Sequence, residues 1–124
     1  MKFTITIPTY STYLNVYCSK KKKKLNQWNN QILANFDSHE DAFNSAGKSY
    51  DIYLNEDGYR CADIVLDQNQ ISIGLIAHEV MHSVFYIMRH VDITLTQESE
   101  EAYTFLNGYL MNSIMQHFEP NKIK

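Results

Sequence analysis

The sequence predicts an α+β domain in which a small, mainly antiparallel sheet packs on a helix of roughly residues 72–89. Two observations lead to this class. In the first half of the chain, apolar and polar side chains alternate in short runs, as in Phe3, Ile5 and Ile7 with threonines between them. This period of two is typical of half-buried strands. In the second half, apolar residues recur three and four positions apart, which is typical of amphipathic helices.

The first half is expected to hold four strands and one helix. Apolar residues at helical spacing between Leu25 and Phe36 predict a helix of roughly residues 22–36. Alternation predicts strands at roughly residues 3–7, 13–18, 50–54 and 61–66, the first two paired as a hairpin. The turn signal Glu56-Asp57-Gly58 joins the last two strands. A second hairpin therefore leads into the helical half of the chain.

Two helices are expected in the second half. The broad apolar face between Ile73 and Met88 predicts the helix of roughly residues 72–89, with Ser72 as its N-cap. An apolar stripe from Ala102 to Ile114 predicts a last helix of roughly residues 97–118, which should run against the first. The chain shows no internal repeat, and its 124 residues suit one domain spanning 1–124.

Composition narrows the function classes. The hydrophobic fraction is 44% and the charged fraction 20%, as in ordinary soluble globular proteins. A net charge of −3 argues against nucleic acid or an anionic membrane as a partner. The N-terminus lacks the apolar core of a standard signal peptide, and Cys18 and Cys61 lack CxxC spacing. We therefore expect a cytoplasmic protein with two free thiols.

Residues 78–82 read His-Glu-Val-Met-His, an HExxH pattern inside the predicted helix. Side chains four apart on a helix lie on adjacent turns, so His78 and His82 can both reach one zinc ion. Glu79 lies about 100° further round the helix, beside the metal, where it can act as a general base on a zinc-activated water. The neighbours between Leu75 and Val84 are nearly all apolar, which favours a metal site over two incidental histidines.

A catalytic zinc usually has three protein ligands and one open position. The downstream candidates for the third ligand are Glu98, Glu100 and Glu101. The helix dipole already accounts for acidic residues in a first helical turn, whereas Glu101 lies beyond that turn at the border of the apolar face. Glu101 is the preferred third ligand, and Glu98 or another residue stays open as the alternative.

An HExxH motif followed by a glutamate on a later helix resembles the gluzincin class of zinc metallopeptidases. In that class the third ligand often lies in an Asn-Glu-Ala stretch, whose last two positions match Glu101-Ala102. The short chain is similar to small stand-alone HExxH proteins of phage and bacterial genomes. The resemblance implies a zinc-dependent hydrolase of peptide or protein substrates, with His78, His82 and Glu101 as ligands and Glu79 as base. The strand at residues 61–66 is the expected edge strand for an extended substrate.

Two further points stay open at the level of sequence. Tyr86 and Tyr103 are candidates for the donor that stabilises the oxyanion of the transition state. Larger gluzincins carry an Asp where this chain has Phe105, and this favours a second function class, a zinc-bearing binding or inhibitor protein, for example a phage factor that captures a host protein. The sequence does not define the substrate, the source organism or the oligomeric state.

Overall fold

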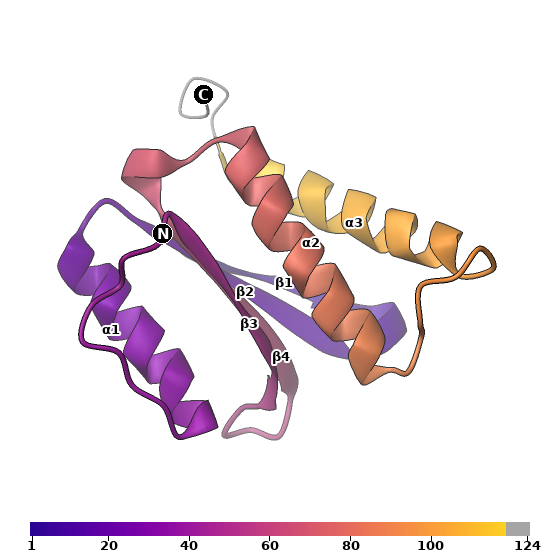
Figure 1. Ribbon diagram of the computed structural model, residues 1–124, viewed down its shortest axis with the longest axis horizontal. Helices are drawn as coiled ribbons and strands as arrows, with labels where there is room; N and C mark the ends of the chain where they lie inside the picture. The colour runs from indigo at the N-terminus through magenta and orange to yellow at the C-terminus, as the bar shows by residue number, and fades with distance from the viewer. Residues whose placement is uncertain (119–124) are drawn as a thin grey trace.

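The computed structural model describes residues 1–118, in which one four-stranded sheet lies between α1 on one face and α2 with α3 on the other (Figure 1). The strands are β1 (Lys2–Ile7), β2 (Thr12–Ser19), β3 (Gly47–Leu54) and β4 (Arg60–Asp67). The helices are α1 (Lys22–Leu33), α2 (Ile73–His90) and α3 (Glu100–Met115). The predicted α+β class is confirmed. All seven predicted elements are present, and α3 is shorter at both ends than expected.

The strand order in the sheet is β1-β2-β4-β3. Both predicted hairpins form, since β1 pairs antiparallel with β2 and β3 pairs antiparallel with β4. The two hairpins join through a parallel pairing of β2 with β4. The sheet is therefore mixed, with antiparallel pairs on both sides of one central parallel pair.

The prediction that residues 61–66 form an edge strand is wrong. β4 lies between β2 and β3, and every residue from Cys61 to Asp67 is buried. Helices cover both faces of a central strand, which explains why its sequence is a nearly continuous apolar run. The edge strand of this hairpin is β3, whose outer side pairs with no other strand among residues 1–118.

The two faces of the sheet carry separate cores. On the α2–α3 face, Leu14, Val16, Ile64 and Leu66 from the central strands pack with buried residues of both helices. On the α1 face, Tyr17, Tyr50 and Val65 pack with Leu25, Ile32 and Phe43 in a smaller cluster. α2 crosses the sheet next to β3 and also contacts α3, so the HExxH helix is supported from two sides.

Local signals explain the start of α2 and the state of the cysteines. The Ser72 side chain accepts a hydrogen bond from the backbone N–H of Leu75 at 3.0 Å, as its predicted role of N-cap requires. Cys18 and Cys61 are both free, as predicted, and both are buried. Burial raises the pKa of Cys18 to about 11 and also raises that of Cys61, so both are protonated thiols near neutral pH.

None of the helices within residues 1–118 combines the length and the apolar character that crossing a membrane requires.

Candidate metal and catalytic site

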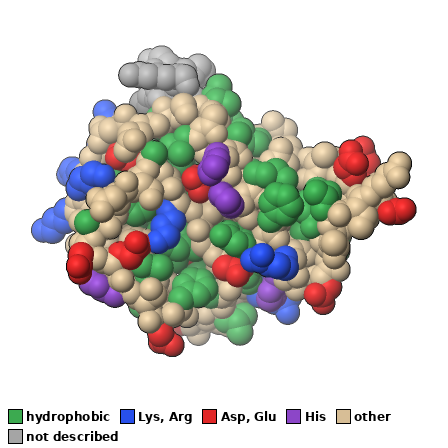
Figure 2. Space-filling model, viewed as in Figure 1, with side chains coloured by type: hydrophobic (Ala, Val, Ile, Leu, Met, Phe, Trp, Pro, Cys, Tyr) green, Lys and Arg blue, Asp and Glu red, His purple; other side chains and the backbone are tan. Residues whose placement is uncertain are grey.

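The two histidines of the motif converge at the surface of α2. Their Nε2 atoms lie 3.2 Å apart, and both side chains are exposed. Two nitrogens bound to one tetrahedral zinc at 2.0–2.1 Å would be separated by about 3.3 Å. Figure 2 shows two histidine side chains adjoining on the face over α2, with an acidic side chain next to them. The spacing of the pair therefore fits two ligands of one ion.

Glu79 lies beside this pair but is buried, with 5% of its surface exposed. The Ser49 hydroxyl on β3 lies 2.8 Å from Oε1 of Glu79 and 2.9 Å from its backbone carbonyl oxygen, and it can donate to either. Buried carboxylates are costly unless hydrogen-bonded. Ser49 therefore fixes the Glu79 carboxylate at the seam between α2 and the edge strand.

Gly47, two residues before Ser49 on the same face of β3, leaves room for Glu79. A Cβ atom at this position would lie 3.0 Å from Cγ of Glu79 and 3.1 Å from side-chain atoms of both Leu66 and Leu75. Sequence reasoning missed Gly47 and Ser49, because the contact with Glu79 spans about thirty residues and neither residue belongs to a recognisable motif.

Gly47→Ala is expected to destabilise the fold by about 1–3 kcal/mol, since the added methyl group overpacks this seam. Urea unfolding followed by circular dichroism measures the change. Gly108→Ala is the matched control, because no atom lies within 4 Å of a Cβ there and alanine is favoured within a helix. A Gly47→Ala protein as stable as the Gly108→Ala protein would contradict the close packing around Glu79.

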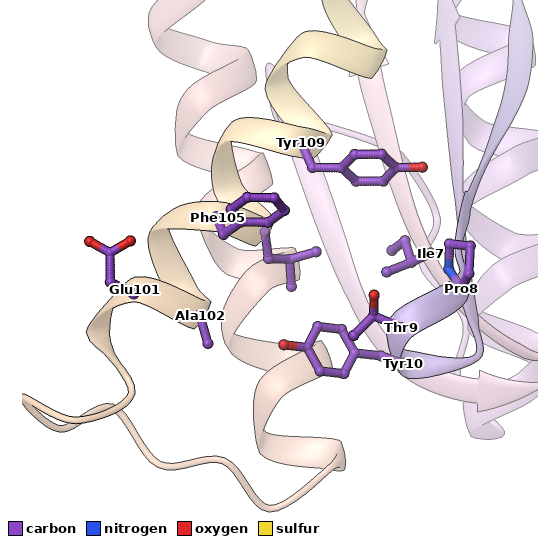
Figure 3. A pocket seen from close by; sticks show the side chains of 9 residues that line it. Ile7, Pro8, Thr9, Tyr10, Glu101, Ala102, Phe105 and Tyr109 are labelled. Carbon is purple, nitrogen blue, oxygen red and sulfur yellow. The ribbon is translucent and has the colours of Figure 1, made fainter.

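Glu101 is not brought to the histidine pair. The prediction that Glu101 lies beyond the first helical turn is wrong, because α3 begins at Glu100 and Glu101 is therefore in that turn. It is exposed, at the rim of a cavity that is lined by the turn after β1 and by Phe105 and Tyr109. Figure 3 shows its carboxylate pointing away from this cavity. Within residues 1–118, no three His, Cys, Asp or Glu side chains form a group able to hold a metal ion. The assignment of Glu101, or of Glu98, therefore stays a prediction.

The two candidate tyrosines differ in their surroundings. Tyr103 is buried, and its hydroxyl donates to the carbonyl oxygen of Ile93 at 2.5 Å, so it is already engaged away from the histidines. Tyr86 is half-buried, and its ring stacks on His82 with centroids 6.4 Å apart. The Arg89 guanidinium lies 5.4 Å from the centroid of the Tyr86 ring and pairs with Asp51 of β3. Tyr86 is therefore the better placed of the two tyrosines.

Comparison with models of protein families, with curated proteins and with solved structures finds no match to this chain.

Proposed function

We propose that this protein is a zinc-dependent peptide hydrolase in which His78 and His82 hold the metal and Glu79 is the general base. The observation that carries the proposal is the joint placement of three side chains. Two imidazole nitrogens converge at 3.2 Å, and the adjacent carboxylate is held by a neighbouring strand. When bound, zinc supplies a Lewis acid and lowers the pKa of a coordinated water to about 7.

The residues of this chain then have distinct tasks. Glu79 accepts the proton of the attacking water and passes it to the leaving amine. Ser49 holds that carboxylate in place through its hydroxyl hydrogen bond. The hydroxyl of Tyr86 can donate to the oxygen that becomes negative in the transition state.

The open edge of β3 supports a peptide as the substrate. β3 carries Ser49 and runs beside α2, so a segment added to its outer side would lie alongside the histidine pair. Main-chain hydrogen bonds to such an edge bind extended peptides. The edge strand beside the HExxH helix is β3 and not the predicted strand at residues 61–66. A zincin-like arrangement of edge strand and helix is therefore still part of this proposal. A cytoplasmic location, in a host cell if the chain is phage-encoded, completes it.

The direct test is cleavage of a diverse peptide library by zinc-loaded protein, read by mass spectrometry. Cleavage should stop after the metal is removed with a chelator and return when zinc is added back. Failure of fully loaded protein to cleave any library peptide would remove the hydrolase proposal and leave the metal site to be judged by zinc binding alone.

A zinc-bearing binding protein is the second candidate, and one surface feature favours it. Phe105 is 78% exposed and Tyr109 is 41% exposed, and both line an apolar cavity of ≈500 Å³ together with Ile7 and Leu106. Exposed aromatic groups gathered around a cavity are typical of a contact surface for a partner. This candidate predicts partner capture that does not depend on Glu79.

The third ligand has its own test. If the Glu101 carboxylate coordinates the metal in the loaded protein, Glu101→Gln is expected to weaken zinc binding at least tenfold. The reason is that loss of even a group that supports a ligand lowers metal affinity by about 10–100-fold. Glu98→Gln should have much less effect. Titration against a chelating dye measures both variants. Equal affinity of both variants and wild type would exclude both glutamates as zinc ligands, and the reverse ranking would move the ligand to Glu98.

A further inference from the structure

A second cavity lies on the opposite face of the sheet from the histidine pair. It has a volume of ≈500 Å³ and opens over β1, β2 and the hairpin of β3 and β4. Four tyrosines line it, namely Tyr13, Tyr17, Tyr53 and Tyr59. The rings of Tyr13 and Tyr59 meet edge to face at 5.5 Å, while Tyr17 packs on Trp28 of α1. The cavity is therefore an aromatic recess beside α1, and nothing in the proposed hydrolysis uses it.

A fully buried carboxylate lies beneath the floor of this cavity. Asp63 is 0% exposed and stands opposite Asn15 in the register of β2 and β4. Asn15, and Cys61 two residues before Asp63 on the same face of β4, both line the cavity. The amide of Asn15 donates to Oδ1 of Asp63 at 2.9 Å. The other carboxylate oxygen, Oδ2, has no hydrogen-bond partner among the described residues.

An unpartnered acceptor in such a place has a cost to the fold. A buried polar group without a hydrogen bond destabilises a protein by roughly 1–3 kcal/mol. Burial raises the pKa of Asp63, although the nearby polar groups of Tyr53 and Asn15 and the charge of Lys2 oppose that rise. Groups kept at the expense of stability are found preferentially at functional sites.

The cavity already accommodates one cation of the chain itself. Nζ of Lys2 lies 5.0 Å from the centroid of the Tyr17 ring, and its charge acts on Asp63. Lys2 is exposed, so its long side chain can swing into solvent. Exposed carboxylates of Glu56 and Asp57 at the rim add negative potential. Electron-rich rings and carboxylates around one space favour a positively charged occupant.

We propose that this cavity binds an organic cation with N–H donors, a guanidinium or primary ammonium group on a short apolar stem. The cation takes the place of the Lys2 ammonium over Tyr17, where the negative charge of Asp63 beneath the cavity floor attracts it. Attraction between opposite charges is stronger beside a buried carboxylate than in water, because the effective dielectric constant is lower there. The tyrosine rings contact the stem and the cation, and the buried carboxylate gives the site its selectivity for positive charge.

The probe is butylguanidinium, and its neutral counterpart of the same shape is butylurea. Chemical shifts of the tyrosine rings, followed by NMR on metal-free protein, report binding independently of the histidine site. We expect saturable binding of butylguanidinium with a dissociation constant of about 1 mM, in keeping with its few heavy atoms. Butylurea should bind at least tenfold more weakly. Equal affinity for the two probes, or no saturation by butylguanidinium up to tens of millimolar (roughly ten times that constant), would overturn the proposal.

Two substitutions should change the affinity for butylguanidinium in opposite directions. Asp63→Asn keeps the size and the acceptor for Asn15 but removes the charge, and should weaken binding at least tenfold. Lys2→Met removes the competing ammonium and should strengthen binding at least threefold. Lys24→Met is the matched control, because Lys24 also lies over an aromatic ring, that of Trp28, but lines no part of this cavity. Unchanged affinity in the first two variants would overturn the proposal.

The stability of the Asp63→Asn protein separates a ligand-binding role from a structural one. Removing an unpartnered buried charge should raise the melting temperature at pH 7 by about 3–5 °C for each kcal/mol regained. Because the folded-state pKa is raised, the gain should shrink as the pH falls toward the ordinary Asp value of 3.8, where the wild-type carboxyl group is neutral as well. A variant that melts well below wild type at pH 7 would make Asp63 a structural residue and overturn the proposal.

Discussion

Replacing either His78 or His82 with alanine is expected to lower zinc affinity at least about a hundredfold, the first of the two largest effects we anticipate. The chain offers two converged imidazole nitrogens, and each substitution removes one of them. Removing a group that only supports a metal ligand typically lowers metal affinity by about 10–100-fold, so removing a direct ligand should lower it further. Elemental analysis of protein purified without chelator, with dye competition for the affinity, measures the loss.

The control for this experiment lies on the same helix. His90→Ala removes an exposed histidine from the last turn of α2, two turns beyond His82 and outside the pair. This variant should carry as much zinc as wild type, about one ion per chain. If the three alanine variants and wild type all hold the same trace of metal, His78 and His82 form no metal site, and the proposed chemistry loses its basis.

The periodicity of the sequence was sufficient to predict the secondary structure. Four strands and three helices lie where alternating and helical patterns placed them, and the Ser72 cap is in place. The final order of the strands was not predictable in the same way. The run from Cys61 to Leu66 is short and apolar, so it is compatible with either an edge or a central strand, and only the parallel pairing with β2 decides between them.

The site was predictable only as far as it is local. The spacing of His78 and His82 on one helix determines their convergence, because four residues make about one turn. Ser49, Gly47 and the buried position of Glu79 depend on how β3 packs against α2, which is a contact between distant parts of the chain. The same holds for Asp63, whose isolation follows from its place in the centre of the sheet.

The second large effect is the loss of cleavage rate expected for Glu79→Gln. This variant also distinguishes a hydrolase from a binding protein. Glutamine has nearly the same size as glutamate, and its amide oxygen can still accept the hydrogen bond from the Ser49 hydroxyl. The fold and the two histidines should therefore be retained, with zinc content and melting temperature close to wild type. The amide cannot accept a proton, and loss of a general base typically lowers the rate about 10²–10⁴-fold.

The measurement is the rate of cleavage of the best library peptide by wild type and by Glu79→Gln, both at full zinc occupancy. Asp41→Asn is the matched control, because it also turns a carboxylate into an amide, at an exposed position in the loop between α1 and β3, and should leave the rate unchanged. A binding protein gives a different pattern, with no cleavage by wild type and with partner capture that Glu79→Gln does not alter. Cleavage that survives Glu79→Gln within a factor of about three, well short of the loss expected for a general base, would remove Glu79 from the role of base. The proton of the attacking water would then have to pass to another group near His78 and His82.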